Sequence, residues 1–281
     1  MEYSEHYFIH NFKVKPASEF DELIINQGTS IYEVIRIEQG IPLFLEDHLT
    51  RLFDSSEIAH LGIHESYCDF ETLIEELIKR NKTDYGKIKL VIRFDKDNNQ
   101  EKDFFIYFTP HYFPSKIEYQ NGVKVGLCRA VRTNPNAKIL NTEARKRANN
   151  TIVEEKLFEV LLMNNDGVIT EGSRSNIFFI KDNTIITPPS HEVLNGITRR
   201  NILRICKKNK IHITEKEIHI SELNQMDTMF LSGTSLKVLP VNCLESKKFN
   251  TQNALLRNLM HWYDELINDY IESKLFNSKN L

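Results

Sequence analysis

Apolar residues recur along the first half of the chain with two different periods, which predicts a mixture of helices and strands. A helical spacing of three to four residues runs through residues 48–63 and 70–78. Residues 30–37, 87–94 and 103–109 are instead rich in β-branched and aromatic side chains, a composition typical of strands. The first half is therefore expected to combine strands with two helices.

The second half repeats this mixture in shorter pieces. Asp166-Gly167 and Lys181-Asp182-Asn183 predict the turns of two hairpins between residues 159 and 187. Further strands are expected near residues 123–130 and 229–231, and further helices at 141–157, 196–208 and 251–276. Hairpins combined with scattered helices predict an α+β fold rather than a doubly wound parallel sheet.

The length of the chain, 281 residues, favours two domains, since single hydrophobic cores usually stop growing near this size. The stretch that follows Pro110 has no regular apolar period and is the best position for a boundary. We therefore predict a small N-terminal domain at 1–115, a linker at 116–122 and a large domain at 123–281.

Composition and charge exclude several classes of protein. The 36 lysines and arginines nearly balance the 39 aspartates and glutamates, which argues against non-specific nucleic-acid binding. No run of about 18 apolar residues predicts a membrane span, and the N-terminal segment lacks the apolar core of a signal peptide, so a cytoplasmic protein is expected. The four cysteines are far apart, and neither they nor the histidines have the spacing of a metal site.

Four short segments could carry chemistry, and each also has a purely structural explanation. Gly196-Ile197-Thr198 could cradle a phosphate at a helix start, or be an ordinary helix N-cap. Residues 232–235 (SGTS) could bind an anion at a strand end, or form a hydroxyl-rich turn. Glu171 could be a buried carboxylate paired with a cation, or a surface residue. Lys138 could be a desolvated nucleophile, or a solvated lysine like most others.

Taken together and in order, six motifs resemble those of the class IV pyridoxal-phosphate enzymes of fold type IV. This family includes branched-chain aminotransferases, D-amino-acid aminotransferases and aminodeoxychorismate lyases. The motifs span about residues 25–245 and comprise 28–36 (GTSIYEVIR), 48–52 (HLTRL), 138–141 (KILN), 169–178 (ITEGSRSNIF), 196–199 (GITR) and 232–235 (SGTS). The resemblance implies a smaller N-terminal α/β domain and a larger C-terminal domain with a β-barrel-like core.

The resemblance also implies a role for each matching residue, with pyridoxal 5′-phosphate as the cofactor. Lys138 matches the Schiff-base lysine, which also shuttles the proton, and Glu171 matches the carboxylate that pairs with the pyridine nitrogen. The residues that match phosphate contacts are Arg51, Ile197, Thr198 and Thr234. Substrate contacts are expected from Tyr32, Arg93 and Ser235, with Arg93 the weaker candidate.

Lys146 is the alternative for the Schiff-base lysine. It lies in the charge run at 143–147, which is typical of a solvated helix face. Only the longer gap from Lys138 to Glu171 accommodates the helix and the strand that the family places between these two residues. Lys138 is therefore the predicted residue.

Three departures from the family patterns affect the predicted reaction. Glu143 stands where branched-chain enzymes usually carry a tyrosine, and Asp95 stands where the D-amino-acid enzymes place a histidine after their arginine. Glu33 stands where the lyases usually have threonine, which is closer to the transaminases. We therefore expect a branched-chain-like aminotransferase that forms a homodimer, with amino acid and 2-oxo acid substrates. A lyase acting on aminodeoxychorismate and a non-catalytic binding module are the alternatives.

Overall fold

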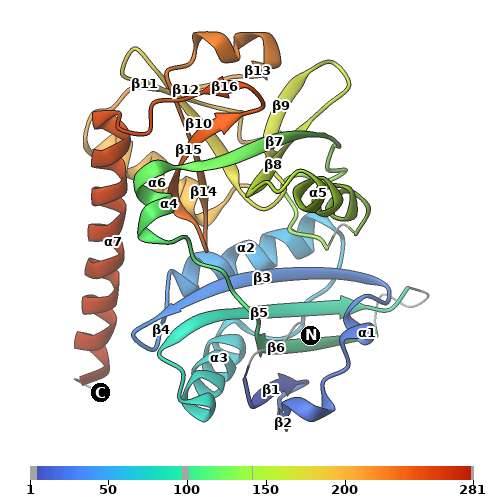
Figure 1. Cartoon of the computed structure of the whole chain (residues 1–281). Helices are drawn as coiled ribbons and strands as arrows, with labels where there is room; N and C mark the ends of the chain where they lie inside the picture. Colours follow the sequence, from blue (N-terminus) through green and yellow to red (C-terminus); the bar gives the residue numbers. More distant parts are fainter. Residues whose placement is uncertain (1–4, 97–100, 141, 280–281) are drawn as a thin grey trace. The chain divides into compact units, whose positions relative to one another are not determined.

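The computed structural model describes residues 5–96, 101–140 and 142–279, and the chain divides into two compact units (Figure 1). Unit 1 consists of residues 1–112, 137–140 and 267–281. Unit 2 consists of residues 113–136 and 141–266. Residues 137–140 thus belong with the N-terminal unit although they follow it in sequence, while Asn141, the last residue of the predicted lysine motif, lies outside the described residues.

Unit 1 is built on a six-stranded sheet with the strand order β2-β1-β6-β5-β3-β4. The strands are β1 (Tyr7–His10), β2 (Lys13–Pro16), β3 (Thr29–Glu38), β4 (Ile41–Pro42), β5 (Tyr85–Phe94) and β6 (Lys102–Phe108). β3 and β5 pair as antiparallel neighbours along their whole length, from Thr29 opposite Phe94 to Glu38 opposite Tyr85. Gly28, which directly precedes this pair, has φ +75°, and a Cβ atom there would lie only 2.1 Å from the carbonyl oxygen of Phe94.

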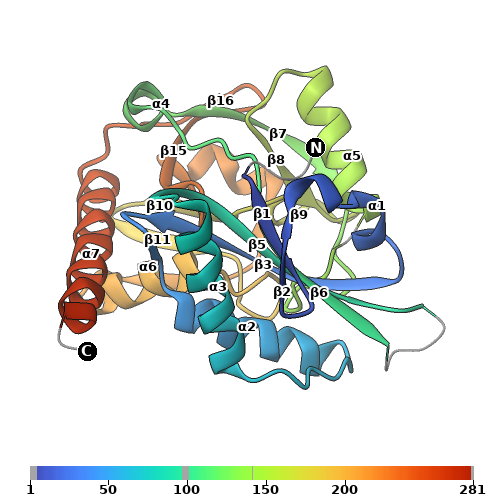
Figure 2. The same ribbon diagram turned by 90° about the horizontal axis from the view of Figure 1, so that it is seen from below.

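One face of this sheet packs against two helices, α2 and α3 (Figure 2). The helical segments of unit 1 are η1 (Ala17–Glu19), α1 (Glu22–Ile25), α2 (Leu45–Ile58) and α3 (Tyr67–Asn81). α3 begins with a capping box, in which the Ser66 hydroxyl accepts from the Asp69 N–H while the Asp69 carboxylate accepts from the Ser66 N–H. Its apolar stripe, with Phe70, Ile74 and Leu77, joins the core formed with the sheet.

The opposite face of the same sheet carries an aromatic cluster that includes Tyr32, Phe105 and Tyr107. Side chains alternate between the two faces of a strand, so Tyr32 lies on this face while its neighbours Ile31 and Glu33 point toward the helices. Leu140 packs against the same cluster. The adjacent residues Tyr32 and Glu33 therefore lie on opposite faces of the sheet, Tyr32 in the aromatic cluster and Glu33 facing the helices.

Unit 2 contains a ten-stranded mixed sheet with the order β12-β11-β10-β14-β15-β7-β8-β9-β13, and β16 pairs with β15. Its strands are β7 (Val123–Arg129), β8 (Glu159–Met163), β9 (Val168–Gly172), β10 (Asn176–Lys181), β11 (Thr184–Thr187), β12 (Ile213–Glu215), β13 (Ile218–His219), β14 (Thr228–Gly233), β15 (Lys237–Leu244) and β16 (Lys247–Lys248). β9 and β10 are distant in the strand order, yet only residues 173–175 join them. The sheet must therefore curl back on itself, as expected of a barrel-like core.

The two predicted hairpin turns are confirmed. Asp182 and Asn183 both have positive φ angles, of 49° and 57°, which is the backbone of a type I′ turn between β10 and β11. In the turn between β8 and β9, Gly167 has φ +84°, and the Asn164 side chain accepts hydrogen bonds from the backbone N–H groups of Asp166 and Val168.

The helical segments of the second half include one in the predicted linker. They are α4 (Lys116–Asn121), α5 (Thr142–Glu154), α6 (Ile197–Lys208), η2 (Ile220–Gln225) and α7 (Ala254–Lys279). α4 occupies residues 116–121 because Ser115 and Glu118 form a capping box, a local signal that apolar periodicity does not reveal.

α7 contributes to both units, since its residues from Ile267 onward count with unit 1. There Tyr270 donates a hydrogen bond of 2.7 Å to Glu46 and accepts one of 3.2 Å from the backbone N–H of Leu45, at the start of α2. In the described part of the chain, no helix, α7 included, combines the length and apolar composition needed to cross a membrane.

Candidate active site

Lys138 lies in a short extended segment that joins the sheet of unit 1 beside β3. The Tyr32 N–H donates a hydrogen bond of 3.0 Å to the Lys138 carbonyl, and the Leu140 N–H donates one of 2.8 Å to the Ser30 carbonyl. Ile139 forms an antiparallel bridge with Ile31. The backbone N–H of Lys138 also donates to the Ser55 hydroxyl of α2, at 3.1 Å. Backbone contacts on both sides therefore fix the Cα position of this lysine.

The Lys138 ammonium lies beside two residues of the motif at 28–36. Its Nζ is 5.2 Å from the ring centroid of Tyr32, within the range of a cation–π interaction. Its charge also contributes to lowering the pKa of the neighbouring Glu33. The predicted lysine and the predicted substrate-contact tyrosine are thus brought together within unit 1.

Glu33 is the centre of a buried charge cluster that the sequence analysis did not identify as such. Its two carboxylate oxygens accept hydrogen bonds of 2.7 Å from Nε and Nη2 of Arg51, which form a bidentate pair. Nδ1 of His48 lies 2.7 Å from Oε2 of the same carboxylate. The HLTRL motif therefore places His48 and Arg51 on one face of α2, opposite Glu33 of β3.

The protonation states in this cluster follow from its charges. Burial raises the pKa of Glu33, but Arg51, Lys138 and His48 outweigh burial and hold that pKa well below its ordinary value. Burial lowers the pKa of His48, against the opposing effect of Glu33. Near neutral pH, Glu33 is therefore ionised and His48 neutral, with its Nδ1–H donating to Glu33.

Arg51, predicted to contact a phosphate, is thus also the partner of Glu33. A guanidinium group has five N–H donors in a planar fork. Pairing through Nε and Nη2 fixes the plane and direction of the side chain, and the phosphate contact of Arg51 stays a prediction. The buried acid that positions this arginine could have been inferred from Glu33, a charged residue placed between the apolar residues Tyr32 and Val34 of the predicted strand.

In unit 2, Glu171 is a buried carboxylate at the end of β9, with a side chain 3% exposed. Nε of Arg132 lies 2.9 Å from its Oε1, and the backbone N–H of Leu194 donates to its Oε2 at 3.2 Å. Arg132 also donates to the carbonyl of Ser173, at 3.1 Å. Glu171 is therefore a buried carboxylate paired with a cation, one of the two possibilities that the sequence left open. The sequence did not identify Arg132 as its partner.

A second carboxylate holds the turn that follows Glu171. Glu159 of β8 is buried and accepts hydrogen bonds from the hydroxyls of Ser173 and Ser175, at 2.6 and 3.3 Å. It also accepts from the Arg174 N–H at 3.2 Å. The serines of the ITEGSRSNIF motif therefore serve to fix the turn that connects β9 and β10.

Helix α6 begins at the predicted phosphate cradle. Its N-cap, Gly196, provides no side-chain hydrogen bond, and both Ile197 and Thr198 are buried. A Cβ atom at Gly196 would lie 2.2 Å from the Asn176 side-chain oxygen, so any other residue here would displace the Asn176 amide. The Asn176 amide in turn donates to the Leu194 carbonyl. One short segment, 194–198, thus links the Glu171 carboxylate to the start of α6.

The second predicted phosphate segment, 232–235, begins in the last two residues of β14, a strand that packs against α6. Thr234 and Ser235 lie in the turn between β14 and β15, and both are partly buried. The buried Ser232 hydroxyl at the end of β14 has no hydrogen-bond partner among the described residues. An uncapped helix start beside a buried, unsatisfied hydroxyl suits the phosphate group of the implied cofactor.

Arg93, the weaker substrate candidate, lies on β5 and forms ion pairs with two acidic residues. It pairs closely with Asp103 of β6, and its Nη1 lies 3.6 Å from Asp95. Asp103 also interacts with the side chains of His10 and Asn11. The structure therefore places Arg93 in a network of unit 1, apart from the Glu33 cluster on the other face of the sheet.

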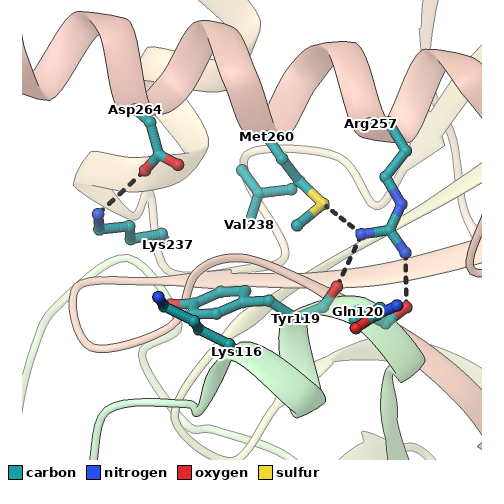
Figure 3. A pocket seen from close by; sticks show the side chains of 8 residues that line it. All are labelled: Lys116, Tyr119, Gln120, Lys237, Val238, Arg257, Met260 and Asp264. Atoms are coloured by element: carbon teal, nitrogen blue, oxygen red, sulfur yellow. Dashed lines mark hydrogen bonds and ion pairs between the residues drawn. The ribbon is translucent and has the colours of Figure 1, made fainter.

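A pocket of about 290 Å³ in unit 2 is lined by none of the predicted site residues (Figure 3). Val238, Met260 and the Tyr119 ring form its apolar centre, and Lys237 pairs with Asp264 at one end. At the other end Arg257 donates to the carbonyls of Tyr119 and Gln120, the last turn of α4. These contacts tie α4 to α7, and they cap the C-terminus of α4.

Comparison with known proteins agrees with the motifs. Residues 30–244 match the family described as amino-transferase class IV. D-alanine aminotransferase from Bacillus licheniformis is 32% identical over 254 residues, which cover 83% of this chain and 88% of the relative. Branched-chain-amino-acid aminotransferase from Pseudomonas aeruginosa is 24% identical over 268 residues, covering 89% of this chain and 87% of that protein.

A solved structure shares the fold of nearly the whole chain. The branched-chain amino acid aminotransferase of Escherichia coli superposes with a TM-score of 0.84 at 21% identity, and the match covers 94% of this chain and 95% of that one. The predicted α+β, two-domain fold of type IV is thereby confirmed. The chain therefore belongs to the class IV aminotransferases, a family of pyridoxal-phosphate-dependent enzymes.

Proposed function

We propose that this enzyme binds pyridoxal 5′-phosphate through Lys138 and transfers the amino group of an amino acid to a 2-oxo acid. The observation that carries the proposal is the placement of Lys138, held by backbone hydrogen bonds to β3 and α2 with its ammonium beside Tyr32 and Glu33. A nucleophilic lysine needs such a fixed position near charged groups. Lys146, the alternative, is exposed on α5.

The residues of unit 2 suit the two ends of the cofactor. Glu171 would hold a proton on the pyridine nitrogen, with Arg132 fixing the orientation of its carboxylate. The N–H groups at the start of α6, with Thr198 and Thr234, would bind the phosphate. When bound, pyridoxal phosphate supplies an aldehyde and an electron-accepting ring.

The residues of unit 1 would act on the substrate. Nζ of Lys138 would remove the proton from the Cα of the amino acid and return it. Glu33 would offset the positive charges of the buried Arg51 and the partly buried Lys138, so that two cations can lie near the same carboxylate. Tyr32 would line the substrate site, and its apolar neighbours Val34, Val91 and Leu140 support an apolar amino-acid side chain.

Substrate preference is part of this proposal. We favour a branched-chain-like amino acid, and the 32% identical relative named D-alanine aminotransferase supports a D-amino acid as the second candidate. A screen of the first half-reaction with L- and D-amino acids, followed by the absorbance of the bound cofactor, distinguishes them. Release of pyruvate from aminodeoxychorismate without nitrogen transfer would indicate the lyase reaction instead.

The central test compares two lysine variants of the same holoenzyme. Lys138→Ala should abolish the visible absorption of the covalently bound cofactor and reduce turnover by at least about a thousandfold, since nucleophile and proton carrier are lost together. The matched control, Lys146→Ala, should retain the band and the activity. An unchanged band in Lys138→Ala, or its loss in Lys146→Ala, would reject the assignment.

A homodimer and a cytoplasmic location belong to the same proposal, and the family resemblance supports the homodimer. Light scattering coupled to size-exclusion chromatography measures the first, with a mass of twice 33.0 kDa expected. Cell fractionation measures the second.

A further inference from the structure

The hydroxyl of Thr198 lies in the first turn of α6, where the sequence predicts a phosphate contact. Thr198 is the second residue of this helix and is only 3% exposed. The first N–H groups of an α-helix have no acceptor within the helix, and the N-cap Gly196 has no side chain to satisfy them. An anion bound here can accept from these N–H groups, and a hydroxyl in the same turn can add a further donor.

Tyr263 of α7 reaches this hydroxyl from a distant part of the sequence. Its phenol donates a hydrogen bond of 3.3 Å to Oγ1 of Thr198, and the contact is buried. Tyr263 is 4% exposed, and both residues belong to unit 2. In the part of the chain that the structure describes, Tyr263 is the only hydrogen-bond partner of the Thr198 side chain.

The direction of this hydrogen bond decides what the Thr198 hydroxyl can do. A hydroxyl has one hydrogen to donate and two lone pairs that accept. Because Oγ1 accepts from Tyr263, its own hydrogen is not used in that contact. This hydrogen can be donated to a further acceptor, and the oxygens of a phosphate dianion are acceptors only. An anion that accepts it also polarises the hydroxyl, which strengthens the hydrogen bond from Tyr263.

We propose that Tyr263 positions the Thr198 hydroxyl as a hydrogen-bond donor to the cofactor phosphate. Tyr263 is a positioning residue, since it acts through Thr198, and it lies outside the six motifs. The inference rests on the proposed function, which assigns Thr198 to the phosphate of pyridoxal 5′-phosphate. A purely structural Tyr263 would only hold α7 against α6, and its hydroxyl would have no effect specific to a phosphate.

Four variants separate these two roles. Tyr263→Phe removes the hydroxyl and keeps the ring, so that the packing of α7 is preserved. Tyr270→Phe is the matched control about two turns later on the same helix, where the phenol donates to Glu46 of unit 1. Thr198→Val removes the other hydroxyl of the pair and keeps the shape of the side chain, whereas Thr198→Ser keeps the hydroxyl.

The measurement is the calorimetric Kd of the cofactor-free protein for pyridoxamine 5′-phosphate and for pyridoxamine. The two ligands differ only in the phosphate group, and neither has the aldehyde that reacts with a lysine. Tyr263→Phe should weaken the binding of pyridoxamine 5′-phosphate by roughly 3- to 10-fold, the effect of losing one neutral hydrogen bond, and leave the Kd of pyridoxamine unchanged. Tyr270→Phe should leave the ratio of the two Kd values as it is in the wild type.

A double-mutant cycle shows whether Tyr263 acts through Thr198. Thr198→Val should weaken the binding of pyridoxamine 5′-phosphate, and Thr198→Ser should retain most of the affinity. In the Thr198→Val background, Tyr263→Phe should cause no further loss. Independent losses from the two substitutions, or equal losses for both ligands in Tyr263→Phe, would overturn the inference.

The same variants distinguish failure of this inference from failure of the proposed function. If Thr198→Val weakens the binding of pyridoxamine 5′-phosphate and Tyr263→Phe does not, the role of Tyr263 alone is wrong. If Thr198→Val leaves both Kd values unchanged, the phosphate contact of Thr198 is wrong, and the role of Tyr263 is wrong with it. Neither result depends on Lys138, whose role is tested by the absorption of the bound cofactor.

Discussion

Glu33 in unit 1 and Glu171 in unit 2 are both buried carboxylates paired with an arginine, yet their surroundings differ. Arg51 donates hydrogen bonds to both carboxylate oxygens of Glu33, and His48 makes a third contact with the same group. The Arg51 side chain is only 4% exposed. Arg132 contacts one oxygen of Glu171, a backbone N–H contacts the other, and the Arg132 side chain is 15% exposed.

This difference indicates that the two carboxylates have different roles. Glu33 is enclosed by side chains of its own unit and balances their charges, so its removal would leave a deeply buried cation unpaired. Glu171 is held by one guanidinium and by the chain itself, an arrangement that fixes its direction for a ligand. We therefore expect substitutions at Glu33 to act mainly on stability and those at Glu171 mainly on activity.

The largest expected effect is on stability. Glu33→Gln keeps the size of the side chain but leaves Arg51 without its buried counter-charge, which should lower the free energy of unfolding by about 3–5 kcal/mol. Urea denaturation at pH 7 measures this loss. The control is Glu76→Gln in α3, whose exposed pair with Arg80 contributes no more than about 0.5 kcal/mol.

The pH dependence gives an independent check of Glu33. Because its pKa is depressed, its stabilisation is present above the ordinary value of 4.5 and is lost as the pH falls toward the lower folded value. The difference in stability between wild type and Glu33→Gln should therefore be constant above about pH 5.5 and shrink below pH 4.5. A difference that grows on acidification would refute the assigned charge state.

The next effect is on activity. Glu171→Gln removes the negative charge beside the pyridine nitrogen and should reduce kcat by roughly 10- to 100-fold, the equivalent of one charge-assisted hydrogen bond. Its free energy of unfolding should fall by less than that of Glu33→Gln, since Arg132 is more exposed and also binds the Ser173 carbonyl. If the two variants lose the same free energy of unfolding, the proposed difference between a stabilising Glu33 and a ligand-orienting Glu171 is wrong.

A smaller effect concerns His48. Its pKa is lowered by burial, so the unfolded chain binds a proton below the ordinary value of 6.5 that the folded chain does not. Stability should therefore fall as the pH drops below 6.5, by up to about 1.4 kcal/mol per pH unit from this residue. His48→Gln should flatten that slope, while the same change at the exposed His64 should leave it unaltered.

The smallest effects compare the capping boxes of the two units. Ser66→Ala at the start of α3 should cost about 1 kcal/mol. Ser115→Ala should cost less, about 0.5 kcal/mol, because α4 has only six residues and Arg257 holds its other end. Thermal unfolding of both variants measures the difference, and a larger effect at Ser115 would show that α4 depends on its N-cap.

Much of the fold follows from local patterns. The apolar stripe of α3, the alternation along β3 and the positive-φ turn at Asp182-Asn183 are each decided within a few residues. α4 was missed because its signal is a capping box in a segment without apolar periodicity. The two units are not two continuous halves of the chain, since residues 137–140 and 267–281 belong to unit 1. Long-range contacts decide this assignment, and local sequence patterns do not reveal them.

The sequence by itself determined the family and the residue types of the candidate site, since six motifs in order identify both. Only the tertiary structure showed that Lys138 joins the sheet that carries Tyr32 and Glu33, and that Arg132 is the partner of Glu171. Hydrogen-bond partners and buried charges are chosen by distance in space, and residues that lie far apart along the chain leave no local pattern from which their pairing can be read.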